Sequence, residues 1–236
     1  MFDDADMFAW LDDQPTPDVE PRDPYVTSAQ LETPIVFSKR AAKREFIAGL
    51  RKEALTALIP ALPPPDVDLW IVSNGAGAET RHGINADVFD FGSFLPVLVG
   101  YLGNTNIHAY ISTWTCARTH TKTILDMLAD GRLKTLFFAS DPYFAKREAA
   151  IFSEFAIGCE KYGDRARILC WKNHCKIFAL ANEDESRTCV ISGSANATSQ
   201  PRSEQYVLTA APEVYRFYRD EFFEAMAANA KAKQNA

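Results

Sequence analysis

Residues 165–209 read RARILCWKNHCKIFALANEDESRTCVISGSANATSQPRSEQYVLT, and this stretch contains four short apolar runs in quick succession. The intervals between the runs are too short for crossover helices, which favours antiparallel strands. The polar segment from Asn182 to Arg187 is typical of a hairpin turn between two of them. An amphipathic pattern from about Glu213 to Ala228 then predicts a final helix. This part of the chain is therefore expected to complete a sheet and to cover it.

The preceding hundred or so residues have a different rhythm, in which short apolar runs alternate with longer segments. Strand-like runs near 67–73, 107–113 and 134–140 are separated by segments with helical spacing. Strands joined by helices imply parallel pairing, with helices packed on the faces of the sheet. We therefore predict an α/β fold with a mixed, largely parallel sheet flanked by helices.

The N-terminal part of the chain differs in composition. Residues 1–33 are acidic and proline-rich, a composition that favours a flexible arm, and residues 34–236 form the predicted folded domain. Apolar residues in the arm suggest that it docks on a basic groove of its own chain or on a basic partner, whereas the plainer interpretation is a solubilising tail. After Ser38, helical spacing predicts an amphipathic helix that Pro60 ends.

The formal charge of −6 is distributed very unevenly. Residues 1–23 contain eight acidic residues and one arginine, a net charge of −7, and subtracting −7 from −6 leaves +1 for the rest of the chain. A nearly neutral body with local basic patches can still bind a phosphate backbone, because the field near a site matters more than the total charge. The net charge therefore does not exclude nucleic acid as a partner.

No apolar run approaches the roughly 20 residues that a membrane-spanning helix needs. The N-terminus, MFDDADMF, does not resemble a secretory leader. The five cysteines are odd in number and form no CxxC pair, which argues against a disulfide framework and a zinc knuckle. We expect a cytoplasmic protein with reduced thiols, no stable membrane association, and neither metal nor cofactor.

Two motifs carry the candidate chemistry. His174-Cys175-Lys176 is expected on a strand, where alternation places His174 and Lys176 on one face, and Ser194 and Asn196 end the next strand, also two residues apart. A hairpin would bring an ammonium, a hydroxyl and an amide around one imidazole. A neutral histidine can attack phosphorus while these donors stabilise charge on the phosphoryl oxygens. Glu204 is positioned in sequence to orient the ring.

In this order, HxK, GSxN and a downstream glutamate resemble the signature of the phospholipase D superfamily. The resemblance covers residues 168–209 most clearly, and it implies that residues 34–236 form a phospholipase D-like catalytic domain. The family's intervening aspartate has no counterpart at its usual place, which Ala181 occupies, and the ANEDESR turn lengthens the lysine-to-glycine stretch. In the family that aspartate generally supports structure rather than reacting.

The resemblance implies a mechanism with two histidines, one phosphorylated and one that protonates the leaving oxygen and then activates water. A second HxK, from His120 to Lys122, lies where a helix is expected to begin and has no GSxN after it. We interpret it as an ordinary helix start. His82 and His108 are likewise interpreted as structural. A chain with one motif can complete such a site by pairing about a two-fold axis, so we expect a homodimer.

The chain's size and single motif resemble the bacterial nuclease branch, which favours nucleic acid, and DNA in particular, as substrate. Basic and aromatic residues near the motifs are candidates for binding it, namely Lys172, Arg187, Arg202 and, for base stacking, Trp171. Two alternatives remain open: a phospholipase or phosphatidyl transferase that uses the same histidine, and a catalytically inactive nucleic-acid-binding module. The motifs do not distinguish DNA from RNA or endo- from exonucleolytic cleavage.

Overall fold

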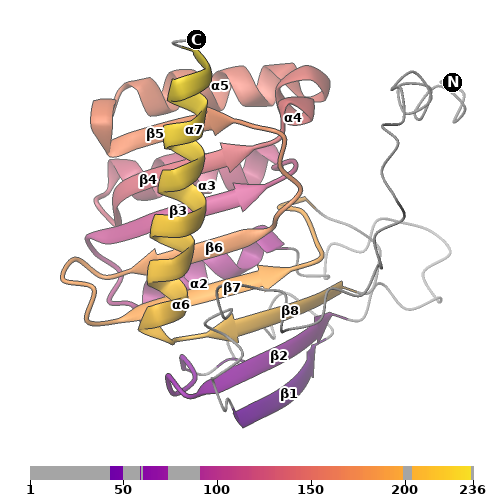
Figure 1. Ribbon diagram of the computed structural model, residues 1–236, viewed down its shortest axis with the longest axis vertical. Helices are drawn as coiled ribbons and strands as arrows, with labels where there is room; N and C mark the ends of the chain where they lie inside the picture. The colour runs from indigo at the N-terminus through magenta and orange to yellow at the C-terminus, as the bar shows by residue number, and fades with distance from the viewer. Residues whose placement is uncertain (1–42, 50–58, 60, 74–90, 199–203, 235–236) are drawn as a thin grey trace, which may run out of the picture. The chain divides into compact units, whose positions relative to one another are not determined.

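A computed structural model describes residues 43–49, 59, 61–73, 91–198 and 204–234, which lie in one compact unit, Ala41–Ala236. The predicted acidic arm, residues 1–33, lies outside the described residues. The described strands form one sheet in the order β1-β2-β8-β7-β6-β3-β4-β5 (Figure 1). The strands are β1 Lys43–Gly49, β2 Val67–Ser73, β3 Ile107–Thr113, β4 Leu133–Ser140, β5 Ala166–Cys170, β6 Ile177–Ala181, β7 Thr188–Gly193 and β8 Glu204–Thr209.

The sheet is mixed, as expected, but parallel pairing does not predominate among the described strands. The pairs β1–β2, β3–β4 and β4–β5 are parallel, whereas β2–β8, β8–β7, β7–β6 and β6–β3 are antiparallel. These directions bring the C-terminal ends of β3, β4, β5 and β7 together with the N-terminal ends of β6 and β8, along the side of the sheet where these strand ends lie. We call this the motif edge; it lies on the right in Figure 1.

The strand predictions upstream of the motifs are confirmed. The structure gives Val67–Ser73, Ile107–Thr113 and Leu133–Ser140 as strands where runs near 67–73, 107–113 and 134–140 were expected. The central strands are almost fully buried, and they are rich in β-branched and aromatic residues. Such runs favour a pleated sheet covered on both faces.

The predicted helix after Ser38 is wrong in the part that the structure describes. Lys43–Gly49 forms β1, and each of its residues is in parallel register with one of β2, from Lys43 opposite Val67 to Gly49 opposite Ser73. Pairing with the outer edge of β2 supplies backbone hydrogen bonds to an extended segment. That contact comes from another part of the chain, so tertiary pairing overrides the local helical spacing.

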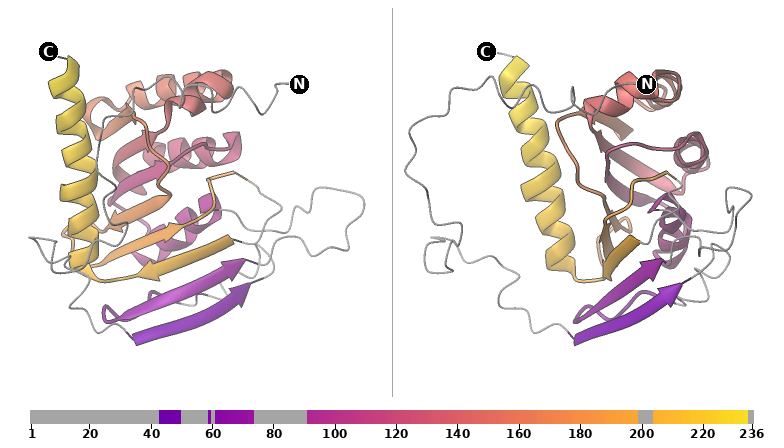
Figure 2. Two further views of the ribbon diagram at one scale, coloured as in Figure 1. Left: turned by 45° about the vertical axis from the view of Figure 1, so that its right-hand side comes forward. Right: turned by 90° about the vertical axis from the view of Figure 1, so that its right-hand side faces the viewer.

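Helices cover both faces of the sheet. The described helical segments are η5 Phe91–Ser93, α2 Phe94–Tyr101, α3 Arg118–Ala129, α4 Pro142–Arg147, α5 Ala149–Glu160, η6 Gly163–Arg165, α6 Pro212–Phe217, the π-helical η7 Tyr218–Glu224 and α7 Ala225–Gln234. Figure 2 shows α6, η7 and α7, which together form the C-terminal helix, on one side of the sheet and α2, α3 and α5 on the other. None of the described helices is long and apolar enough to span a membrane.

Alternation along the strands divides the core between the two faces. On β6, Phe178 and Leu180 join the cluster under α2 and α3, whereas Ala179 and Ala181 join the cluster under the C-terminal helix. Small residues on the second face let that helix approach the sheet closely. Tyr215 and Phe223 of the helix are fully buried there. The same strands therefore support two packed layers and hold the motif edge rigidly between them.

Candidate active site

All the described motif residues lie at the motif edge. His174 and Lys176 precede β6, Ser194 and Asn196 follow β7, and Glu204 is the first residue of β8. The predicted hairpin between β6 and β7 is confirmed. The antiparallel register thus brings two motifs that are well separated in sequence to one place.

The hairpin turn closes at the opposite edge of the sheet. The Asn182 N–H donates to the Arg187 carbonyl at 3.0 Å, and Asn182 Oδ1 accepts from the Arg187 N–H at 2.8 Å. At the motif edge the Gly193 N–H donates to the Lys176 carbonyl at 3.1 Å, just beyond the pair Ile177–Ser192. This last bond aligns the two motif segments with each other.

The HxK segment is not on a strand, contrary to the prediction, because β6 begins only at Ile177. Side chains there make the backbone hydrogen bonds that a neighbouring strand would otherwise make. Asn173 Oδ1 accepts from the Cys175 N–H at 2.8 Å, and the Ser112 hydroxyl donates to the Cys175 carbonyl at 3.1 Å. Since both backbone groups of Cys175 are satisfied in this way, the segment can leave the sheet without an orphaned polar group.

His174 and Lys176 nevertheless meet as predicted. Nζ of Lys176 lies 2.9 Å from Nδ1 and 3.2 Å from Nε2 of His174, and it donates to the His174 carbonyl at 2.6 Å. Lys176 is 95% buried, with a relative exposure of 5%, while His174 is exposed. The lysine is therefore fixed from inside the protein, and the imidazole is presented at the surface.

The HxK segment is anchored to the ends of β3 and β4. The buried Asn173 side chain donates to the Ser112 hydroxyl at 2.5 Å, and the Asn173 N–H donates to Asp141 Oδ2 at 3.1 Å. Ser112 is fully buried near the end of β3, and Asp141 directly follows β4. This network ties the histidine's neighbours to two parallel strands, and it limits the movement of the ring.

The GSxN segment is also anchored to the end of β3. The Ala197 N–H donates to Thr113 Oγ1 at 3.1 Å, and the Ala117 N–H donates to the Ala197 carbonyl at 2.7 Å. Ser112 and Thr113 are adjacent, so two neighbouring residues of β3 hold the two motif segments. Their relative position is therefore set by a single strand end.

Gly193 is required by the packing of β8. A Cβ at this position would lie 2.3 Å from Cδ1 of Tyr206 and 2.9 Å from the Gln205 carbonyl oxygen. Tyr206 is buried, and one of the two clashing atoms belongs to the backbone, so a Cβ would require the strand itself to shift. The glycine in GSxN thus permits β7 to approach β8 closely, which places Ser194 beside Glu204.

Ser194 and Glu204 form a direct pair. The Ser194 hydroxyl donates to Glu204 Oε2 and accepts from the Gln205 N–H at 3.1 Å. The charge of Glu204 also raises the pKa of Lys176, opposing the larger effect of burial. In the described contacts, Glu204 therefore acts on the hydroxyl and the ammonium, while its predicted role in orienting His174 stays a prediction.

Asn196 is half-buried, and its Oδ1 has no hydrogen-bond partner among the described residues. A buried amide oxygen in this condition costs free energy unless water or a bound group satisfies it. Ala195 and Ala197 on either side are buried, which holds Asn196 in place. Asn196 is thus held in position beside Ser194 at the motif edge.

The electrostatics of the site favour a neutral imidazole. Burial and, to a smaller extent, the Lys176 ammonium lower the pKa of His174, while the carboxylate of Asp141 raises it. Burial also lowers the pKa of Lys176. A cation beside a partly desolvated imidazole penalises the doubly charged state, so the ring keeps a free lone pair over a wider pH range.

Two aromatic residues beside His174 were not singled out from the sequence. The rings of Trp114 and His174 are 5.4 Å apart between centroids, and Trp114 stacks on Tyr143 at 4.4 Å with an interplanar angle of 10°. Trp114 directly follows β3, and Tyr143 follows β4 after two intervening residues. The rule that strand ends of parallel strands meet at one edge is the signal that could have found them.

The predicted substrate-binding residues are not all brought to the site. Lys172 is exposed two residues before His174, and Trp171 packs partly against the core beneath the C-terminal helix. Arg187 lies at the opposite edge, where it donates to the Tyr101 carbonyl, so its predicted role is not supported by its position. Arg202 lies outside the described residues.

The remaining described histidines have structural surroundings. His108 lies at the start of β3, at the opposite edge, with Nδ1 2.7 Å from Thr135 Oγ1. His120 lies in the first turn of α3, as predicted, and its ring covers Gly92 so closely that a Cβ there would be 2.3 Å away. His82 lies outside the described residues.

A pocket of about 370 Å³ adjoins the site on the side of the C-terminal helix. Lys176, Ser194 and Tyr218 line it, together with residues of β2, β7 and β8. Its wall combines an ammonium and a hydroxyl with apolar surface. Among the described residues no group of three or more His, Cys, Asp or Glu side chains could hold a metal ion.

The described geometry thus defines a class of site: an exposed imidazole held against a buried ammonium, with a hydroxyl, a carboxylate and an amide beside it. Comparisons with known proteins add no relative, since no family model matches the chain and no curated protein matches it.

Proposed function

We propose that this protein is a phosphodiesterase of the phospholipase D superfamily, and specifically a metal-independent nuclease that acts through a phosphohistidine intermediate. The observation that carries the proposal is the pairing of His174 with the buried Lys176, which lines one pocket together with Ser194. An imidazole that resists protonation is suited to nucleophilic attack, and a fixed ammonium is suited to stabilising a phosphoryl oxygen.

In the proposed reaction, a ring nitrogen of His174 attacks phosphorus and forms a P–N bond. The bond from phosphorus to the leaving oxygen breaks, and that oxygen takes a proton from His174 of a second copy of the chain. Water then attacks phosphorus while the second histidine accepts its proton. The P–N bond breaks, and its electron pair returns to His174, so both imidazoles recover their initial states.

The surrounding residues stabilise the negative charge that builds up on the non-bridging oxygens. Lys176 provides the cation, and the Asn196 amide provides a neutral hydrogen-bond donor. The Ser194 hydroxyl becomes a second neutral donor once it turns from Glu204 to the phosphoryl oxygen. This set performs the work for which many phosphodiesterases use a divalent cation. The proposed assembly is a homodimer, in which a two-fold axis brings the two copies of His174 together.

Nucleic acid, and DNA in particular, is the proposed substrate class. Two exposed cations support this choice: Arg147, which lies over the Tyr143 ring, and Lys172, two residues before His174. Such side chains can bind flanking phosphates. A phospholipase or phosphatidyl transferase would use the same histidine on a lipid headgroup, and an inactive module would bind nucleic acid without turnover.

The test is incubation of the full chain with labelled single- and double-stranded DNA and RNA, with and without EDTA, and in parallel with phospholipid vesicles. Cleavage that persists in EDTA and is lost in His174→Asn is the expected result. Strict dependence on Mg²⁺ or Mn²⁺ contradicts the metal-independent mechanism. Headgroup release without nucleic-acid cleavage favours the lipid alternative, and binding without any cleavage favours the inactive module.

A further inference from the structure

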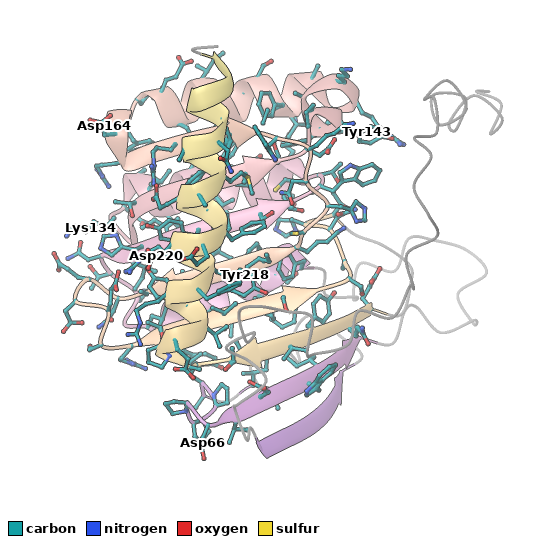
Figure 3. The ribbon with its side chains drawn as sticks, in the orientation of Figure 1. Asp66, Lys134, Tyr143, Asp164, Tyr218 and Asp220 are labelled. Atoms are coloured by element: carbon teal, nitrogen blue, oxygen red, sulfur yellow. The ribbon has the colours of Figure 1, made fainter. Side chains whose placement is uncertain are left out.

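A continuous row of side chains leads away from His174 along the motif edge. Trp114 follows His174 at 5.4 Å between ring centroids, and Tyr143 follows Trp114 at 4.4 Å. The guanidinium carbon of Arg147 lies 5.5 Å from the Tyr143 ring, and Arg147 donates to the Tyr143 hydroxyl. We call Trp114, Tyr143 and Arg147 the aromatic row; Figure 3 labels Tyr143 at this edge.

The aromatic row is held in place by the residues that hold His174. Asp141 Oδ1 accepts from the Tyr143 N–H at 2.8 Å, and its Oδ2 accepts from the N–H of Asn173, next to His174. One carboxylate therefore sets the positions of both Tyr143 and the histidine segment. Trp114 directly follows Thr113, the buried residue that also binds the GSxN segment. The distance between row and nucleophile is thus a fixed property of the fold.

The row is open to solvent. Trp114 and Tyr143 are both partly exposed, and the Arg147 side chain is 65% exposed. Trp171, by contrast, packs partly against the core under the C-terminal helix. Tyr143 covers one face of Trp114, and Arg147 lies over the Tyr143 ring, but both aromatic side chains stay partly exposed. A flat, apolar ligand would bury the apolar surface that remains exposed.

We propose that the aromatic row binds a nucleobase next to the scissile phosphodiester, with Arg147 contacting a neighbouring phosphate. The inference rests on the proposed function, which it narrows to substrates with unpaired bases. Within a duplex, base faces are covered by their neighbours, so a strand must be single or a nucleotide extruded before the row can reach it. Stacking engages the face of any base, and the row therefore discriminates unpaired from paired nucleotides rather than one sequence from another.

The test measures binding, which separates the row from catalysis. Equilibrium affinity is compared for two strands of equal length, oligothymidylate and a strand whose central nucleotides are abasic. Wild-type protein should bind oligothymidylate about tenfold more tightly, the scale of one stacked base. Trp114→Leu and Tyr143→Leu should remove most of this preference, and Trp114→Phe should retain much of it.

Tyr162→Leu is the matched control, because Tyr162 also pairs with an arginine, Arg165, but lies before β5 at the opposite edge. Figure 3 labels Asp164 and Lys134 on that side, away from Tyr143. The control should keep the wild-type preference. Thermal unfolding of each variant shows whether a loss of preference reflects a loss of folded protein. A Trp114→Leu protein that fails to fold leaves Tyr143→Leu to decide.

Equal affinity of the wild-type protein for the two strands overturns the row as a base site while leaving the nuclease proposal intact. If the protein binds neither strand but hydrolyses bis(p-nitrophenyl) phosphate, both the base site and nucleic acid as the substrate are overturned. The proposed phosphodiesterase chemistry would then still stand. Preferential binding to anionic phosphatidylglycerol vesicles, lost in Trp114→Leu, also overturns the inference, because the rings would then enter a lipid interface.

Discussion

Nζ of Lys176 lies close to both ring nitrogens of His174, 2.9 Å from Nδ1 and 3.2 Å from Nε2. The lysine is buried, whereas the histidine is exposed. A fixed positive charge at this distance acts on the imidazole whenever the protein is folded.

The titration of His174 should be displaced to lower pH. Burial and Lys176 lower its pKa, so the midpoint in an NMR titration should lie below about 6.5, the ordinary value. Lys176→Gln should move the midpoint upward by removing the nearby cation. Lys172→Gln removes an exposed charge two residues away and should move it much less. A Lys176→Gln midpoint equal to that of the wild type would exclude the electrostatic coupling.

Because folding lowers the pKa of His174, this residue should make the folded protein less stable as pH falls. The pKa of His174 is lower in the folded chain than in the unfolded chain, so the unfolded chain binds the proton first as pH falls. The contribution of His174 to stability is therefore lost progressively as pH falls from about 6.5 towards its lower folded pKa. Urea unfolding at several pH values should show a smaller loss for His174→Asn than for the wild type.

Asp141 should affect the site by charge and the fold by hydrogen bonding, and two substitutions separate these effects. Asp141 caps α4 through the Tyr143 N–H, and asparagine can retain that cap. Asp141→Asn should therefore lower the pKa of His174 further and keep the cap, losing only the bond that Asp141 Oδ2 accepts from the Asn173 N–H. Asp141→Ala should in addition cost about 1 kcal/mol of unfolding free energy, the usual value of a lost cap. Equal stability of the two variants would show that the cap contributes nothing.

Asn173 should be a positioning residue for the HxK segment. Its side chain bonds Ser112 and the Cys175 N–H within the protein. Asn173→Ala should cost about 1–3 kcal/mol of stability, because it leaves buried polar groups unpaired. It should also reduce kcat more than KM, since the ring would be held less firmly. Wild-type kcat in a folded Asn173→Ala protein would argue against this role.

Glu204 and Ser194 should be energetically coupled. Because the Ser194 hydroxyl donates to Glu204, removing either partner disturbs the same hydrogen bond. We expect Glu204→Gln to fold and to lower kcat, and Ser194→Ala combined with it to lower kcat by less than the product of the two single effects. An unchanged rate in Glu204→Gln would remove this residue from the site, and strictly multiplicative effects would contradict the coupling.

The two-histidine mechanism makes a quantitative prediction for mixed dimers. His174→Asn is uncharged and similar in size, so mutant and wild-type chains can be unfolded together and reassembled at random. If each reaction requires His174 from both copies, only wild-type pairs are active, and an equal mixture should retain about one quarter of full activity. Retention of about one half would show that each chain acts alone.

The sequence by itself determined the local elements and the identities of the reactive groups. The runs at 67–73 and 107–113 became strands with those bounds, because buried β-branched and aromatic runs favour the sheet wherever they lie. The polar turn from Asn182 to Arg187 predicted the hairpin that aligns the motifs, since turn chemistry is local. His120 at a helix start followed from local spacing in the same way.

Only the tertiary structure decided features that depend on contacts between distant segments. Lys43–Gly49 became β1 because the edge of β2 was available to pair with it, although its own spacing favoured a helix. The HxK segment left the strand because Ser112 and Asn173 satisfied its backbone. Arg187 was carried to the far edge by the strand register, and Trp114 and Tyr143 were brought beside His174 by the common edge of parallel strands. The spacing of apolar residues in the sequence indicates whether a segment favours a helix or a strand. The contacts described above depend instead on which strands lie side by side, and the packing of the whole core decides that order.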